Sequence, residues 1–259
     1  MVRPSTESEP APAVVHSADR PTESLEQASG RISVRIDNAT VGATRLVQRV
    51  VDLEPDEPWH QLHQHSEDVV YVATGSGVAH YQNQTLRLEP GTGCVFQPGS
   101  EYSITAAEPM RLISVLSPPP DRPNSHPPAA EVEEVAQPRV HESDEEVISA
   151  GDDESRDYMD RYFKLMIDPR YGAHYVTQFI GFIERSKAPP HTHTYDEVVY
   201  ILGGQGTVHI NDAAHPISAG DSVYLPPGSV HCLENQGDEP LALLGVFCPA
   251  GSPRARERA

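Results

Sequence analysis

Three histidines and one glutamate lie in two short clusters in the C-terminal half of the sequence. One residue separates His191 from His193, Glu197 follows four positions later, and His231 comes after a Pro-Gly pair. In an extended segment, residues i and i+2 point to the same face, so the first two imidazoles would lie together. Three imidazoles and one carboxylate suit a divalent ion of Fe, Mn, Ni, Co, Cu or Zn. The pattern therefore predicts a metal site at these four residues.

Strands must bring the two clusters together. The apolar run 198–202 directly follows Glu197, and it has the length and composition of a strand. Alternate residues of a strand point to the same face, so Val199 and Ile201 should share the face of Glu197, which must point inward to bind a metal. We expect them to line a substrate pocket. Gln178, a polar residue on an otherwise apolar segment, is a third candidate for this lining.

The spacing of these residues resembles the two signature motifs of the cupin superfamily. The first motif, H-x-H-x3-E-x6-G, is matched by His191, His193, Glu197 and Gly204. The second motif, G-x5-P-x-G-x2-H-x3-N, is matched by Gly220, Pro226, Gly228, His231 and Asn235. One departure is Arg185, which stands where the family usually has glycine. The resemblance implies an all-β fold built from small antiparallel barrels of the double-stranded β-helix or jelly-roll type.

The N-terminal half repeats the C-terminal half. A shift of 129 positions aligns residues 69–71 with 198–200, and it aligns the turn residues 98–100 with 227–229. A repeat of this length indicates two copies of one domain. The chain is thus identified as similar to bicupins, which carry two barrels in one polypeptide.

The metal positions differ in the N-terminal copy. His63 and His65 correspond to the first two ligand histidines, Asp68 corresponds to the glutamate, and Tyr102 stands in place of the third histidine. Two imidazoles and a carboxylate could hold a metal, so His63, His65 and Asp68 form a candidate second site. A phenol is a poor ligand while protonated, and its ordinary pKa is about 10. This difference favours a barrel that is kept for structure or assembly.

Composition divides the chain into ordered and unstructured segments. The beginning is rich in Pro, Ser, Glu and Ala, which predicts disorder, and the middle is acidic and rich in proline. Tyr71 and Tyr200 point outward by strand parity, so we expect the two barrels to pack through these faces. The predicted segments are a disordered tail (1–30), an N-terminal barrel (31–117), a linker (118–157), a C-terminal barrel (158–250) and a short tail (251–259).

The net charge limits the classes of binding partner, and the cysteine content indicates the cellular compartment. The formal net charge of -19 repels phosphates, which argues against nucleic acids and anionic membrane surfaces. No apolar run is long enough for a membrane-spanning helix. Cys94, Cys232 and Cys248 follow no metal-finger spacing, so we expect reduced thiols in a cytoplasmic protein. The expected partner is a small-molecule substrate, and a homodimer through the barrel faces is a further expectation.

Four protein ligands leave two positions open on an octahedral ion. O2 and a chelating substrate could then bind together, so we rank a non-haem metal dioxygenase or other oxidoreductase first, with iron favoured and a small oxygenated organic molecule as substrate. Two alternatives stay open. One is a non-redox isomerase, lyase or hydrolase that uses the metal as a Lewis acid. The other is a non-catalytic protein that binds a small molecule. The pattern assigns no residue a catalytic role.

Overall fold

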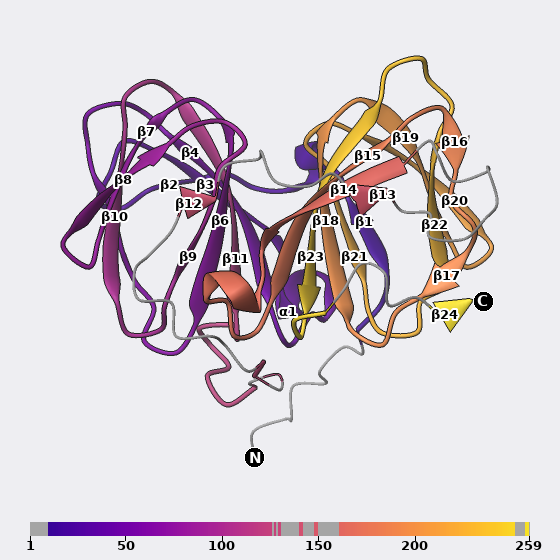
Figure 1. Ribbon diagram of the computed structural model, residues 1–259, viewed down its shortest axis with the longest axis horizontal. Coiled ribbons are helices and arrows are strands. Elements are labelled where there is room, and N and C mark those ends of the chain that lie inside the picture. The colour runs from indigo at the N-terminus through magenta and orange to yellow at the C-terminus, as the bar shows by residue number, and fades with distance from the viewer. Residues whose placement is uncertain are drawn as a thin grey trace.

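Strands form almost all of the regular structure in the computed structural model, as expected for an all-β protein. The structure describes residues 10–125, 127, 129–130, 140–141, 148–149, 161–251 and 257–258. Figure 1 shows two barrels side by side, the N-terminal one in indigo to magenta and the C-terminal one in orange to yellow. The helical segments are α1 (Asn38–Val41) and the 3-10 turns η1 (Ser17–Asp19) and η3 (Pro169–Tyr171). None of the described helices is long and apolar enough to cross a membrane.

The N-terminal barrel has two facing antiparallel sheets. Its strands are β2 (Glu23–Ser24), β3 (Gly30–Ile36), β4 (Val47–Leu53), β5 (Trp59–Leu62), β6 (Glu67–Thr74), β7 (Gly77–Tyr81), β8 (Gln84–Leu88), β9 (Gly93–Phe96), β10 (Glu101–Ala106), β11 (Met110–Ser117) and β12 (Val140–His141). One sheet has the order β12-β9-β6-β11-β4-β3-β2, and the other has the order β5-β10-β7-β8. Along β4, Val51 and Leu53 pack inside the barrel whereas Val50 packs toward the second barrel. Both faces of this sheet are therefore apolar.

The C-terminal barrel repeats this arrangement. Its strands are β13 (Ile148–Ser149), β14 (Arg161–Ile167), β15 (Thr177–Ile183), β16 (Ser186–Lys187), β17 (His191–Thr192), β18 (Asp196–Gly203), β19 (Gln205–Ile210), β20 (Ala213–Ser218), β21 (Ser222–Leu225), β22 (His231–Asn235), β23 (Leu241–Cys248) and β24 (Glu257–Arg258). Together with β1 (Ala13–Val15), one sheet has the order β1-β21-β18-β23-β15-β14-β13. The other has the order β20-β19-β22-β17-β24, with β16 also paired to β22.

Residues 10–30 belong to the folded structure, so the predicted disordered tail is wrong for this part of the chain. β1 pairs antiparallel with β21 at the edge of the C-terminal barrel, and β2 pairs with β3 in the N-terminal barrel. Between them, the backbone N–H of Ser17 donates to Asp221 Oδ1 at 3.0 Å. Pairing satisfies backbone groups and covers a sheet edge, which gives order to a segment with few apolar side chains. Residues 1–9 lie outside the described part.

The two barrels pack through the faces that carry the outward tyrosines. Tyr71 and Tyr200 belong to one buried apolar cluster, which also includes Val69 and Val115 from the first barrel and Val246 from the second. This face is therefore covered within a single chain. A homodimer stays a prediction, and it would have to use a different surface.

Two carboxylates at equivalent positions of the repeat cross the interface between the barrels. Glu67 accepts hydrogen bonds from the backbone N–H groups of His174, Tyr175 and Val176 at 2.7, 2.8 and 3.0 Å. Asp196, 129 positions later, accepts one from Arg45 NH1 at 2.9 Å. Each barrel therefore holds a segment of the other through a buried acid.

The Glu67 contact should make stability depend on pH. Burial raises the pKa of Glu67 from 4.5 to about 7, although the hydrogen bonds from residues 174–176 oppose this shift. An acid whose pKa is raised by folding adds to the free energy of unfolding, and this contribution is complete at pH values below its ordinary pKa. The contribution is lost as the pH rises through the pKa of the folded state. Between pH 4.5 and 7, wild-type protein should thus lose up to about 3 kcal/mol of unfolding free energy through this group.

Urea unfolding at pH 5 and pH 8 measures this loss. The Glu67→Gln variant keeps a neutral side chain of similar size, so it should lose less stability than wild type over the same interval. Equal pH dependence in the two proteins would contradict the assignment.

Candidate metal centre

Three short strands of the C-terminal barrel, with the loop that follows the first of them, place the predicted ligands around one point. His191 lies on β17 opposite His231, the first residue of β22, and Glu197 lies on β18 in the other sheet of the barrel. The ligand atoms of His191, His193 and His231 all lie within 4.8 Å of one another. Glu197 Oε2 is 3.4 Å from His193 Nε2 and 3.3 Å from His231 Nε2. The structure thus brings together all four residues that the motif pointed to.

Backbone carbonyls set the orientation of two imidazoles. His191 Nδ1 lies 3.0 Å from the carbonyl oxygen of Pro189, and His231 Nδ1 lies 2.9 Å from that of Ser229. A carbonyl oxygen can only accept, so Nδ1 carries a proton in both rings, and in the neutral ring Nε2 is the atom with the lone pair for a metal. Hydrogen bonds of this kind commonly orient metal-binding histidines. Both imidazoles are therefore arranged as metal ligands.

Glu197 supplies a buried negative charge to this cluster. Burial alone raises the pKa of Glu197, but the nearby imidazoles of His231, His193 and His191 lower it to about 2. Its Oε2 is inaccessible to solvent and has no hydrogen-bond partner among the described residues. A buried anionic oxygen that faces imidazole nitrogens is costly unless a cation satisfies it. The residues therefore fit a divalent transition metal.

A small cavity of about 80 Å³ opens beside these ligands. Its walls are mostly apolar, and one cationic side chain, Arg161, also lines it. The apolar lining residues are Phe163, Phe179, Gly181, Phe182, Ile183, Ala188, Leu233, Leu243 and Phe247. Val199 and Ile201 pack in the apolar core of the same barrel, as their parity predicts, but they are not part of the cavity wall.

The prediction that Gln178 lines the pocket is wrong. Its partners across β14 and β23 are Ile167 and Val246, whose side chains belong to the cluster between the barrels. A Cβ atom on Gly93 of the first barrel would lie 3.0 Å from Gln178 Oε1. The side chain therefore faces the other barrel, and its neighbour Phe179 points into the cavity.

Sequence reasoning missed Arg161 as a lining residue. Arg161 and Phe163 are two positions apart on β14, so they share a face, and both line the cavity. The spacing of Arg161 and Phe163 is the sequence signal that could have predicted that both line the cavity. It could not be used without knowing that β14 pairs with β15 next to the ligands.

Other residues of the two motifs shape loops around the site. Asn235 Nδ2 donates to the backbone carbonyls of Ile183 and Glu239 at 2.9 and 2.8 Å. Gly204 has a φ of +79°, and a Cβ atom there would lie 2.5 Å from the carbonyl oxygen of Pro240. Both motif residues therefore have a structural role. Asn235 ties two backbone segments together, and any side chain at Gly204 would strain the turn.

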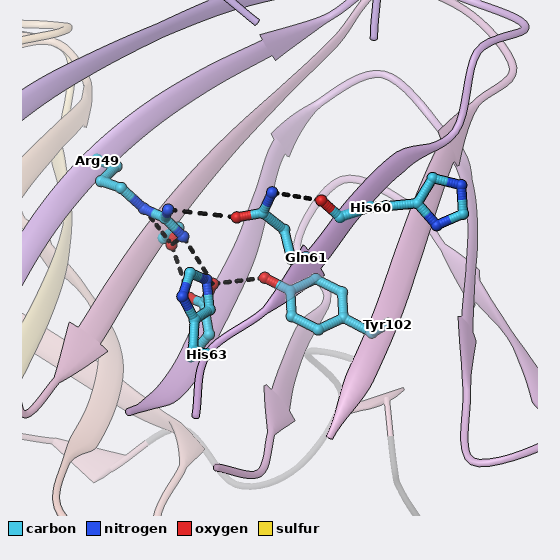
Figure 2. A network of polar contacts seen from close by, with 7 residues as sticks. Arg49, His60, Gln61, His63 and Tyr102 are labelled. Carbon is cyan, nitrogen blue, oxygen red and sulfur yellow. Dashed lines mark hydrogen bonds and ion pairs between the residues drawn. The ribbon is translucent and has the colours of Figure 1, made fainter. Parts of the chain in front are cut away.

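In the N-terminal barrel, an arginine pairs with the carboxylate that corresponds to Glu197. Figure 2 shows Arg49 and Tyr102 converging beside His63. Arg49 NH2 donates to Asp68 Oδ2 at 2.8 Å, Tyr102 Oη donates to the same oxygen at 2.5 Å, and Ser114 Oγ donates to Oδ1 at 2.6 Å. Burial, together with the charge of Asp68, raises the pKa of Tyr102 well above its usual value, so the phenol stays a donor. The carboxylate is thus neutralised by a side chain.

The candidate second site does not assemble. His65 is exposed to solvent, and His63 Nε2 lies 3.7 Å from Asp68 Oδ2. Phe96 stacks on Tyr102 with ring centroids 3.7 Å apart, and Trp59 packs against the same ring, so aromatic side chains fill the interior. Within the described ranges, the cluster of histidines able to hold a metal lies in the C-terminal barrel.

Comparison with known proteins relates both halves of the chain to one family. A cupin domain model matches residues 49–116 and 182–247, together just over half of the chain. A segment of 65 residues, 25% of this chain, is 38% identical to 52% of an uncharacterized protein of Methanocaldococcus jannaschii. A segment of 70 residues, 24% of this chain, is 39% identical to 58% of an oxalate-binding protein of Thermotoga maritima. The chain therefore spans little more than half the length of these curated relatives.

Solved structures share the arrangement of two barrels. A protein of Pseudomonas aeruginosa described as glyoxylate-induced superposes with a TM-score of 0.75 at 18% identity, covering 96% of this chain and 93% of that one. The oxalate decarboxylase of Lactobacillus farciminis gives a TM-score of 0.71 at 17% identity, covering 90% and 85%. At 18% and 17% identity, these similarities show a shared fold and carry no conclusion about function.

Proposed function

Because the chain belongs to the cupin domain family, we propose that its C-terminal barrel binds one divalent transition metal and acts on a small oxygenated organic molecule by non-redox chemistry. Lyase, hydrolase and isomerase reactions fall in this class. The observation that carries the proposal is the cluster of three histidines with Glu197 beside a small, mostly apolar cavity.

The residues of the site have separate tasks. His191, His193, Glu197 and His231 would hold the ion, and the carbonyls of Pro189 and Ser229 fix two of the rings. An ion held there supplies a Lewis acid for a carbonyl or carboxylate oxygen. The mostly apolar walls would contact the apolar part of a bound substrate. At 10–15 Å³ for each water, the cavity has room for roughly five to eight water-sized groups, which suits a molecule of a few non-hydrogen atoms.

The relatives support the non-redox reaction over an oxygenase. By their names, one of them binds oxalate and another decarboxylates it, and oxalate is a small oxygenated acid. None of these names supports the expected dioxygenase or the preference for iron, so we rank oxygen chemistry below the non-redox class. The oxalate-binding relative favours a second candidate function, which is metal-dependent binding without turnover.

Turnover assays with metal-loaded protein test the proposal. Protein loaded with Mn²⁺, Co²⁺ or Zn²⁺ is incubated with oxalate and other short oxygenated acids, while NMR follows the products and an electrode follows O2. We expect product without O2 consumption, and no product with the His193→Ala variant. Product formed only with stoichiometric O2 consumption would contradict the non-redox reaction, and binding without product would favour the second candidate.

A further inference from the structure

Arg45 of the N-terminal barrel reaches the segment of the C-terminal barrel that carries two of the four candidate ligands. Its NH1 donates to Asp196 Oδ2 at 2.9 Å, and Asp196 directly precedes Glu197 at the start of β18. His193 lies three positions before Asp196. Resting on the proposed function, we infer that Arg45 is a positioning residue of the metal centre. The first barrel thus helps to build the metal site of the second.

Asp196 is held from both barrels. Its exposed fraction is 4%, Tyr224 Oη donates to its Oδ1 at 2.6 Å, and Arg45 donates to its Oδ2. Tyr224 lies on β21, which pairs with β18, so this contact stays within the C-terminal barrel. A buried carboxylate is costly unless it is hydrogen-bonded and paired, and Arg45 brings an opposite charge across the interface. The start of β18 is therefore fixed by a side chain of the other barrel.

The fixed residue stands in a short backbone segment between two candidate ligands. At one end of this segment, the carbonyl oxygen of His193 accepts from the backbone N–H of Gly228 at 2.8 Å. At the other end, neighbouring strand residues point to opposite faces, so Asp196 turns toward the first barrel while Glu197 turns toward the histidines. Metal sites require ligand distances within about 0.2 Å of their usual values. A small shift of Asp196 would therefore displace Glu197 enough to weaken metal binding.

The backbone of Arg45 is fixed independently of its guanidinium. Its carbonyl oxygen accepts from Ser117 Oγ at 2.9 Å and from Cys248 Sγ at 3.8 Å. Ser117 ends β11, and Cys248 ends β23 opposite Asp196. A change of the Arg45 side chain does not remove these contacts, so variants at this position test the guanidinium alone.

The metal affinity of Arg45 variants tests this inference. Each protein is titrated with Co²⁺ in competition with a chelator, and the visible spectrum of the bound ion is recorded. Loss of an outer hydrogen-bond partner of a ligand costs about 10- to 100-fold in metal affinity, and Arg45 acts one residue further away, so we expect Arg45→Gln to bind Co²⁺ about 3- to 10-fold more weakly, with a changed spectrum. Arg45→Lys should recover most of the affinity and the wild-type spectrum, because the contact uses one nitrogen that an ammonium group can replace.

The sign of the effect separates position from charge. Removal of a positive charge near the site would by itself favour a bound cation, because like charges repel. An equal or higher affinity in folded Arg45→Gln would therefore overturn the positioning role. Combined with Asp196→Asn, Arg45→Gln should cause no further loss, since the two side chains act as one unit. Additive losses would show that Arg45 does not act through Asp196.

The matched control is Arg111→Gln. Arg111 also reaches β18 from the N-terminal barrel, where it bonds to Tyr200, and its side chain is 44% exposed against 41% for Arg45. Tyr200 lies three positions beyond Glu197, so this variant should keep the wild-type cobalt affinity. An equal loss in both variants would show that any weakening of the contact between the barrels lowers metal affinity, which would overturn the specific role of Arg45.

The result separates from that of the proposed function. Wild-type protein that binds no Co²⁺ would overturn the proposed function, whereas a cobalt-binding wild type with unchanged affinity in Arg45→Gln would overturn only the role of Arg45. If Arg45→Gln does not fold, Asp196→Asn replaces it in the comparison. Unchanged affinity in Asp196→Asn would then overturn the role of Arg45, and a loss that Arg45→Lys does not share would support it.

Discussion

Replacement of His193 by alanine should remove the metal from the protein, whereas wild type should hold one ion per chain at the single described cluster. The His193 side chain is buried, and its Nε2 lies 3.4 Å from Glu197 Oε2. Loss of an outer hydrogen-bond partner of a ligand already costs about 10- to 100-fold in affinity, so loss of the ligand itself should cost more than about 100-fold. Elemental analysis after dialysis measures the occupancy.

The matched control is His63→Ala, because His63 Nε2 faces the carboxylate of the N-terminal barrel, 3.7 Å from Asp68 Oδ2, as His193 Nε2 faces Glu197. This variant should keep its metal, because Arg49 and not an ion neutralises Asp68 there. Full occupancy in His193→Ala would refute the assignment of the centre. A loss of metal in folded His63→Ala would instead show that the N-terminal barrel takes part in metal binding.

Replacement of Arg49 by methionine should destabilise the N-terminal barrel strongly. Methionine keeps much of the apolar stem but leaves the carboxylate of Asp68 buried without its cation. Removal of one partner from a buried ion pair typically costs about 3–5 kcal/mol. Tyr102 and Ser114 still donate to the carboxylate, so we expect a loss near the lower end of this range. Urea unfolding at neutral pH measures the change.

An exposed ion pair provides the comparison. Arg185 and Asp238 lie 3.2 Å apart, and their side chains are 71% and 93% exposed. Arg185→Ala should change stability by less than about 1 kcal/mol, because exposed pairs contribute little. Metal content should be normal in both variants. A folded Arg49→Met protein as stable as Arg185→Ala would show that the guanidinium does not balance a buried charge.

Local patterns were sufficient to predict the two barrels and to identify the four candidate metal ligands that the C-terminal barrel brings together. The i, i+2 spacing of His191 and His193 fixes a shared face in any extended segment, whatever lies around it. The shift of 129 positions between the halves likewise depends on sequence alone. Turn residues such as Gly204 are required by the backbone itself. These features are local or repeated, so they are visible without knowledge of the packing.

Residues distant in the sequence decided the rest of the site. Arg49 and Asp68 are 19 positions apart and Ser114 is a further 46 away, and no local pattern shows that they meet. The same holds for Arg161, which reaches the cavity only because β14 pairs with β15. The strand at residues 13–15 was missed because its order comes from pairing with β21 on the other barrel.

Gln178 shows why strand parity alone was not enough. Alternation divides the residues of β15 into two faces, but both faces are buried, one in the barrel and the other against the second barrel. When each face is apolar, the pattern cannot tell which one points inward. For β18 the candidate ligand Glu197 decided the question, and Val199 and Ile201 do pack on the inner face, although they do not line the cavity. On β15 no residue of known direction was available, so only the packing of the two barrels determined that Phe179 faces the cavity and Gln178 faces Gly93.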